Sequence, residues 1–284
     1  MTGRAEHIDV RPLRSMAECQ AAAELQREVW GTDYTDVVPA TFLHVLDYVG
    51  GLAAGAFDES GELLGFVFGV SGIRDSELVH WSHMLGVRVA ARNLGLGRRL
   101  KEYQRDTMQA IGVKRILWTF DPLMSKNAYF NLVRLGARVV DYVTDMYGTT
   151  SSPLHLGMPT DRLIVCVDTA SCPLETRTAA PVAPPVLTAF PQMNDVTLSR
   201  SAPPPEHALI EVPADILELL AVSPSAARTW RLAVRDYFLW ALSQGFGVVG
   251  VQRDAPTNRW FYVLQRAQSA PLLSTASREL QQTS

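Results

Sequence analysis

Residues 85–100, which read LGVRVAARNLGLGRRL, contain the turn that decides the fold. An apolar segment typical of a strand leads into this turn, and a segment with helical spacing follows it. Gly95 and Gly97 lack side chains, so an anion can approach the backbone closely. The first amide hydrogens of a helix have no partner within it, and the helix dipole adds partial positive charge there. The turn therefore predicts a pyrophosphate site, to which Arg92, Arg98 and Arg99 add formal charge.

Three other interpretations of this turn compete with that one. An ordinary strand-to-helix turn also uses glycine, simply to allow tight packing. The dinucleotide-binding fingerprint G-x-G-x-x-G would need glycine where Leu100 stands, and an acidic residue would have to close the next strand. A Walker loop would need Gly-Lys-Ser/Thr, which does not follow the turn. On the glycines alone, the ordinary turn remains the main alternative.

The composition indicates a folded chain with a substantial core. Of the 284 residues, 47% are hydrophobic and 19% are charged, enough for one large domain or two smaller ones. The net charge of −3 lacks the basic surface that nucleic-acid phosphates require, and three cysteines are too few for a disulfide framework or a zinc site. Since we find no secretory signal and no apolar run near ~20 residues, we expect a cytoplasmic protein without a metal, a nucleic-acid partner or a membrane partner.

Apolar periodicity predicts a mixed sheet with helices on its faces, an α+β arrangement, in the first part of the chain. The expected order is β-α-α-β-β-β-α-β-α-β-β. The predicted strands cover 8–11, 52–58, 63–70, 77–89, 115–120, 138–147 and 163–167, and the predicted helices cover 15–29, 39–48, 96–111 and 127–135.

A change of composition after residue 168 predicts the domain organisation. Residues 171–205 hold 8 of the 17 prolines, which is typical of an extended linker between a domain over 1–170 and a small C-terminal α/β subdomain over 206–268. We expect a flexible tail over 269–284. The amphipathic helix predicted over 224–244 indicates that the subdomain packs on the first domain or on a second subunit, which would make a homodimer.

The pattern Arg92-x-x-Gly95-x-Gly97 resembles the signature Arg/Gln-x-x-Gly-x-Gly/Ala of the GNAT superfamily, with Val87 five residues before the arginine. The resemblance covers about residues 7–168. Segments over 119–123, 127–131 and 157–163 are further similar to an uncharacterised bacterial branch of GNAT acetyltransferases with an extra C-terminal α/β segment. The resemblance implies an acyl-CoA-dependent N-acyltransferase that uses acetyl-CoA or another short acyl-CoA, such as succinyl-CoA. The implied acceptor is a small-molecule amine or amino acid.

The resemblance also implies where the acyl donor binds. The strands ending at Val89 and Phe120 are expected to diverge, and the pantetheine arm would lie in the gap between them. The expected cofactor-binding residues are Leu85, Val87, Arg92, Gly95, Leu96, Gly97, Arg98, Asn127 and Asn131.

His83 is the candidate catalytic base. Strand alternation places its side chain on the same face as Leu85 and Val87, with His80 on the other face. The arylalkylamine-acetylating branch of the superfamily carries a catalytic histidine at this position, whereas many relatives have a glutamate where Trp81 stands. A histidine that is simply hydrogen-bonded within the sheet is the alternative.

The usual tyrosine acid of the superfamily is replaced by Leu132. Tyr147 and Tyr142 are the candidate substitutes, and a packed aromatic role is the alternative for both. We expect Trp81 and Arg162 to contact substrate, although a surface ion pair would also account for Arg162.

Two other functions stay open. A GNAT fold with a missing acid and an unsettled base is also compatible with a non-catalytic CoA-binding or sensor protein, or with an assembly protein built on that fold. Protection by CoA against thermal unfolding would separate the binding functions from assembly, and thiol release with amines would separate the enzyme from the sensor.

Overall fold

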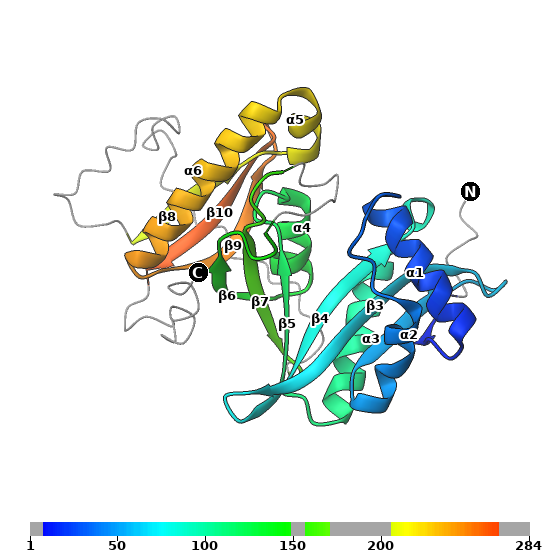
Figure 1. Ribbon diagram of the computed structural model, residues 1–284. Helices are drawn as coiled ribbons and strands as arrows, with labels where there is room; N and C mark the ends of the chain where they lie inside the picture. The colour runs from blue at the N-terminus through cyan, green and yellow to red at the C-terminus, as the bar shows by residue number, and fades with distance from the viewer. Residues whose placement is uncertain (1–7, 149–156, 171–205, 267–284) are drawn as a thin grey trace.

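The computed structural model describes residues 8–148, 157–170 and 206–266, and its main feature is a seven-stranded mixed sheet (Figure 1). The strand order is β1-β2-β3-β4-β5-β7-β6, and every neighbouring pair is antiparallel except β4 and β5, which are parallel. The strands are β1 (Asp9–Pro12), β2 (Leu52–Phe57), β3 (Leu63–Arg74), β4 (Glu77–Val87), β5 (Arg115–Phe120), β6 (Arg138–Val143) and β7 (Arg162–Asp168).

Helices cover both faces of this sheet, as the periodicity predicts. On one face lie α1 (Met16–Trp30) and α2 (Ala40–Val45), which is followed by the short 3-10 helix η1 (Asp47–Val49). The other face is covered by α3 (Leu96–Ala110), by α4 (Ser125–Tyr129) and by the π-helical segment η3 (Phe130–Arg134). A further 3-10 turn, η2 (Val89–Ala91), leads from β4 toward α3.

Two of the predicted boundaries that differ from the structure do so for local reasons. β3 continues to Arg74 because Asp75 and Ser76 both adopt positive φ, at 51° and 61°, and join β3 to β4 in a two-residue hairpin turn. β6 ends at Val143 instead of 147, since Asp145 has a φ of 48° and turns the chain.

β4 and β5 diverge along their length. Their parallel pairing is limited to three residue pairs, from Val79 with Arg115 to Trp81 with Leu117. Beyond Trp81, β4 stays paired with β3 through Val87 but has no partner on its β5 side. The predicted gap between these two strands is therefore present, and it begins at Ser82.

A β-bulge at His83 makes the predicted orientation of the two histidines wrong. Phe68 pairs with Met84 and the next residue, Gly69, pairs with Ser82, so His83 is an extra residue on β4. The extra residue interrupts the alternation on which the prediction depends. His80 lies on the α3 face, as Leu85 does, whereas His83 contacts Phe68 on the α1/α2 face.

The C-terminal part forms a separate three-stranded antiparallel sheet of order β8-β10-β9, with one long helix across it (Figure 1). Its elements are β8 (His207–Val212), α5 (Ile216–Val222), α6 (Pro224–Ser243), β9 (Phe246–Asp254) and β10 (Arg259–Arg266). The buried stripe of α6 consists of Ala227, Arg231, Val234, Phe238 and Ala241.

This subdomain packs against the first part of the same chain. The ring of Phe238 stacks on Tyr142 at 5.0 Å, and the hydroxyl of Tyr262 donates a hydrogen bond of 2.8 Å to the Pro122 carbonyl. One hydrophobic core runs through both parts. The predicted linker over 171–205 and the predicted tail over 269–284 lie outside the described residues. None of the helices within the described ranges combines the length and hydropathy that a membrane crossing requires.

Candidate active site

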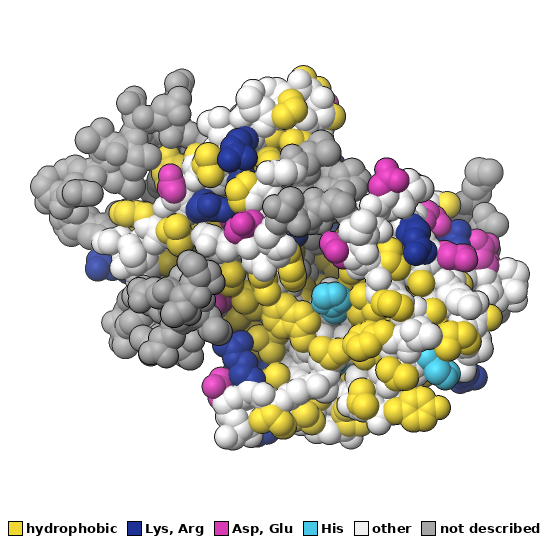
Figure 2. Space-filling model, in the orientation of Figure 1, with side chains coloured by type: hydrophobic (Ala, Val, Ile, Leu, Met, Phe, Trp, Pro, Cys, Tyr) yellow, Lys and Arg dark blue, Asp and Glu magenta, His cyan; other side chains and the backbone are white. Residues whose placement is uncertain are grey.

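A cavity of about 620 Å³ lies where β4 and β5 diverge. Residues of β4, β5, α3, α4 and η3 line it, together with Tyr34 and Asp36 from the segment between α1 and α2. Figure 2 shows the molecule hollowed between the α1/α2 half and the half with the small sheet, and hydrophobic side chains gather in the hollow. This size is within the range of small-molecule sites.

The start of α3 carries no side-chain cap and lies next to one of the residues that line the cavity. Gly95 is the N-cap residue, with a φ of 76°, and its carbonyl accepts the amide hydrogens of Arg98 and Arg99. The amides of Leu96 and Gly97 have no intrahelical acceptor. A Cβ atom on Gly97 would lie 3.3 Å from the ring of Phe130, which lines the cavity. The predicted anion site thus has backbone donors and little side-chain bulk, and Phe130, which lines the cavity, lies beside it.

The arginines around this turn differ in what they contact. Arg92 is exposed at the turn. Arg98 forms an ion pair with Glu102 at 2.8 Å, one helical turn further on. Arg99 donates to the Ile8 carbonyl at 2.5 Å. Arg92 is therefore the exposed cation nearest in sequence to the glycines.

Leu85 and Val87 lie where the prediction requires them. Each pairs with β3 on one side, Leu85 with Val67 and Val87 with Gly65, while the other edge has no β5 partner. A ligand arm with amide groups can form hydrogen bonds to such an open edge as an added strand would.

The two predicted asparagines both line the cavity but differ in exposure. Asn131 is buried, and its Oδ1 accepts from the indole Nε1 of Trp118 at 2.7 Å. Its Nδ2 donates to the Asn127 carbonyl at 2.8 Å. Asn127 is exposed. Asn131 therefore fixes Trp118 and the cavity wall, and Asn127 is the amide that a ligand can reach.

His83 lines the cavity from the bulge in β4, and its side chain is exposed there. Its ring lies 5.4 Å from that of Phe68. The surrounding protein withdraws water from part of the ring, and this desolvation lowers the pKa of His83 below its ordinary value. The lowered pKa favours the neutral imidazole, the form that can accept a proton.

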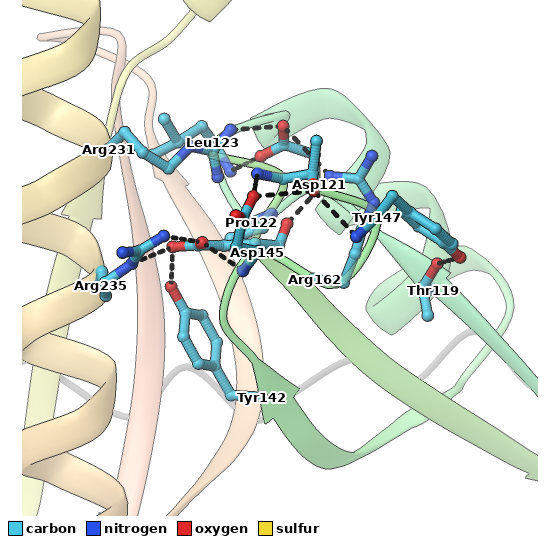
Figure 3. Close-up of polar contacts among 12 residues, drawn as sticks. Thr119, Asp121, Pro122, Leu123, Tyr142, Asp145, Tyr147, Arg162, Arg231 and Arg235 are labelled. Carbon is cyan, nitrogen blue, oxygen red and sulfur yellow. Dashed lines mark hydrogen bonds and ion pairs between the residues drawn. The ribbon is translucent and has the colours of Figure 1, made fainter. Parts of the chain in front are cut away.

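Of the two tyrosines, only Tyr147 lines the cavity. Its hydroxyl lies 3.1 Å from Thr119 Oγ1 on β5. Tyr142 is buried, donates to Asp161 Oδ2 at 2.7 Å and points toward α6, away from Tyr147 (Figure 3). Burial and the Asp161 carboxylate raise its pKa. The prediction of a catalytic Tyr142 is wrong in placement, because its hydroxyl donates to Asp161 and its ring stacks on Phe238 of α6.

Of the two residues predicted to contact substrate, one lines the cavity and the other does not. Arg162 lines the cavity, with its guanidinium 5.2 Å from the ring centroid of Tyr147 and 3.7 Å from Asp121 Oδ2. Trp81 instead packs with Leu117, Ile164 and Cys166 and is absent from the cavity wall that the described residues form. Its register beside Leu117, before the strands diverge, accounts for this position.

Several residues in or beside the cavity were not predicted from the sequence. Lys101 and Gln104 lie on the buried stripe of α3 between Leu100 and Met108, and two polar residues on an apolar stripe were a signal that could have identified them. Asp121 lies at the end of β5 and forms an ion pair with Arg231, which is 110 positions away in the sequence. A contact over that separation leaves no local pattern.

Comparisons with known proteins give structural likeness only. No protein-family model matches the chain, and no curated protein matches it. The ribosomal-protein-S18-alanine N-acetyltransferase from Escherichia coli is 14% identical, with 58% of this chain and 96% of that chain covered and a TM-score of 0.45. An acetyltransferase of the GNAT family from Streptococcus pneumoniae is 15% identical, with 57% and 99% covered and a TM-score of 0.47.

An aminoglycoside 6'-acetyltransferase type Ii is 19% identical, with 59% of this chain and 100% of that chain covered and a TM-score of 0.46. In all three comparisons the similarity extends over somewhat more than half of this chain. At these levels of identity and similarity, the chemistry of the cavity has to be argued from its own residues.

Proposed function

We propose that this chain is an acyl-CoA-dependent N-acyltransferase of the GNAT type. It would transfer a short acyl group, acetyl or succinyl, to the amine of a small molecule or amino acid by direct attack on the thioester. The observation that supports this best is the cavity between the diverging strands β4 and β5, whose lining residue Phe130 lies beside the uncapped start of α3 at Gly97. A diphosphate at the helix and an extended arm in the gap would together bring a thioester into the cavity.

The residues present fit such a donor. The amides of Leu96 and Gly97, with Arg92 nearby, would hold the diphosphate. The open edge of β4 and the exposed amide of Asn127 would bind the amide groups of the arm. The bound thioester places an activated acyl carbon beside the acceptor amine.

His83 would remove the proton from the acceptor amine. It reaches the cavity from the bulge, and its lowered pKa favours the neutral form that accepts a proton. Holding the amine and the thioester together contributes further, since well-oriented reactants gain several kcal/mol from proximity.

Tyr147 and Arg162 form a polar corner of the same cavity. A guanidinium beside an aromatic ring is suited to a carboxylate, which either an amino-acid acceptor or a dicarboxylic acyl group such as succinyl carries. This corner supports a carboxylate on one of the two substrates, either the acceptor or the acyl group.

The alternative is a CoA-binding or sensor protein without catalysis. Leu132, which stands where the resemblance implies a tyrosine acid, is buried in the core, and Tyr142 is committed elsewhere. Assembly through the C-terminal subdomain, including a homodimer, remains a proposal that needs an oligomer measurement.

A glycine substitution tests the donor site. Gly95→Asp places a carboxylate at the helix start and should weaken CoA binding at least ~100-fold, because negative charge and bulk replace an anion site. Gly61→Asp is the matched control, since Gly61 also has a positive φ, 83°, and open space around it, but lies in the β2–β3 hairpin. Both variants carry similar backbone strain.

CoA affinity is measured by calorimetry and by the rise in Tm on adding CoA. Equal affinities in Gly95→Asp and Gly61→Asp would contradict the donor site. A panel of amines and amino acids with acetyl-CoA and succinyl-CoA, followed by thiol release, then separates the enzyme from the sensor. CoA binding without thiol release for any pair favours the sensor.

A further inference from the structure

Lys101 is a buried lysine that faces the gap between β4 and β5. It lies on α3, its side chain is 7% exposed, and it lines the cavity. Its Nζ donates to Ser82 Oγ at 2.7 Å and to Gln104 Oε1 at 3.4 Å. The same atom lies 4.1 Å from the ring centroid of Trp118 on β5. Ser82 is the residue at which the two strands begin to diverge.

The neighbours of Lys101 are neutral. From β4 it meets Ser82 and the buried His80, from α3 Gln104, and from β5 the indole of Trp118. Among the described residues Lys101 forms no ion pair with a carboxylate. A buried ammonium without a counter-charge holds its proton weakly, and burial lowers the pKa of Lys101 to about 7.

We propose that Lys101 protonates the departing sulfur of the acyl donor, with Ser82 as the residue that positions it. This inference rests on the acyl-transfer function proposed above. It assigns the acid to the α3 side of the gap and leaves His83, on the α1/α2 side, as the base.

Each bond, electron pair and proton in this step has a donor and an acceptor. The acceptor nitrogen forms a bond to the acyl carbon, and the carbon–sulfur bond breaks with its electron pair on sulfur. Lys101 Nζ gives one proton to that sulfur and becomes neutral, while His83 takes the proton that the acceptor nitrogen sheds. Both residues then re-equilibrate with water in the cavity.

The relative acidities of the two groups favour proton transfer from Lys101 to the departing sulfur. An ordinary lysine, with a pKa near ~10.4, would protonate a thiolate with a pKa near ~8.5 only uphill. A lysine that titrates near pH 7 transfers its proton downhill. Burial thus turns a residue that is normally too weak an acid into a competent one.

Lys101→Met tests the assignment, because methionine keeps the length and the burial but holds no proton. We expect kcat for thiol release to fall about 100-fold. The KM for acyl-CoA, and the increase in Tm that CoA produces, should each change by less than about threefold. In the wild type, kcat should fall as pH rises through about 7, since the acid form is lost. That alkaline limb should be absent from the residual activity of Lys101→Met.

Two further variants serve as comparisons for Lys101→Met. Lys114→Met removes an exposed lysine of the surface and should keep the wild-type profile. Ser82→Ala should lower kcat by less than Lys101→Met and keep an alkaline limb, shifted in pH, because the acid remains but has lost its hydrogen-bond partner.

A readout independent of activity is the pH dependence of Tm. Lys101 has a lower pKa in the folded chain than in the unfolded chain, so its contribution to stability is complete above about pH 10 and is lost as pH falls toward 7. Lys101→Met should therefore raise Tm at pH 7 and raise it less at pH 10.

The outcomes separate the two proposals. An active wild type combined with an unchanged kcat in Lys101→Met, or with an alkaline limb that persists in its residual activity, would overturn the role of Lys101 alone. A wild-type chain that binds CoA but releases no thiol with any amine would overturn acyl transfer and this inference together.

Discussion

His80 lies fully buried between β4 and α3, and its tautomer is fixed by its neighbours. The Ser71 hydroxyl donates to the Gly50 carbonyl at 2.6 Å, so Ser71 Oγ accepts from His80 Nδ1 at 2.9 Å. The other ring nitrogen, Nε2, then accepts from the Gln104 amide at 3.1 Å. Burial, and secondly the charge of Lys101, lower the pKa of His80 to about 4.

This fixed neutral histidine predicts a loss of stability in acid. The pKa of His80 is about 4 in the folded chain and ~6.5 in the unfolded chain, so its contribution is complete above pH 6.5. It is lost as pH falls from 6.5 to 4, by up to about 3 kcal/mol. Urea unfolding at pH 7 and pH 4.5 should show a smaller acid loss for His80→Gln than for the wild type. His44→Gln, on α2, is the control, and equal losses in all three chains would contradict the argument.

The polar residues on the buried face of α3 show how much of the site can be predicted from the sequence at the scale of single residues. The spacing of Leu96, Leu100 and Met108 predicts the buried face of α3, and Lys101 falls on the same face. A lysine there has to lose its water, and that much follows from periodicity. Its partner Ser82 lies on a strand, so the pairing itself required the tertiary structure.

At the scale of elements, periodicity reveals order but not irregularity. The succession of strands and helices up to β7 was predicted correctly because each element buries one face. The bulge at His83 and the π-helical turn η3 each insert one residue without a glycine or proline to mark it. The predicted facing of His83 failed for that reason, although His83 still reaches the cavity.

The bulge makes a prediction about deletions. Removing His83 joins Ser82 to Met84, and the flanking side chains keep their faces because the deleted residue is the extra one. Removing Leu85, in the regular part of β4, shifts the register and turns side chains over to the wrong face. Thermal unfolding should show a much larger loss of Tm for the Leu85 deletion. Equal losses would contradict the assignment of the extra residue.

At the scale of the molecule, two arginines of α6 connect the C-terminal subdomain to the cavity wall (Figure 3). Arg231 is fully buried and pairs with Asp121 at the end of β5. Arg235 donates to Asp161, beside Arg162, with its Nε at 2.9 Å. The sequence predicts this subdomain and its amphipathic helix. It does not indicate where the helix docks, because that depends on charges far apart in the chain.

The contact between Arg231 and Asp121 predicts a large cost for removing one partner. Arg231→Met removes the closest ion-pair partner of the buried Asp121 carboxylate, whose ion pair with Arg162 is longer, at 3.7 Å, so unfolding should require about 3 kcal/mol less. Arg259→Met breaks the exposed pair with Glu211 and should cost less than about 1 kcal/mol. Urea denaturation measures the free energy of unfolding of both variants. Similar losses in the two variants would contradict a stabilising role for the buried pair of Arg231 and Asp121.

The brief pairing of β4 with β5 has a mechanical consequence. Three residue pairs join the two strands at one end. Beyond them the strands diverge, and the hydrogen bonds that normally pair neighbouring strands do not continue between β4 and β5. The proposed donor would form hydrogen bonds to this open edge of β4 and so complete the sheet while it is bound. If it does, resistance of the chain to heat and to protease should rise with the fraction of chains that hold a donor.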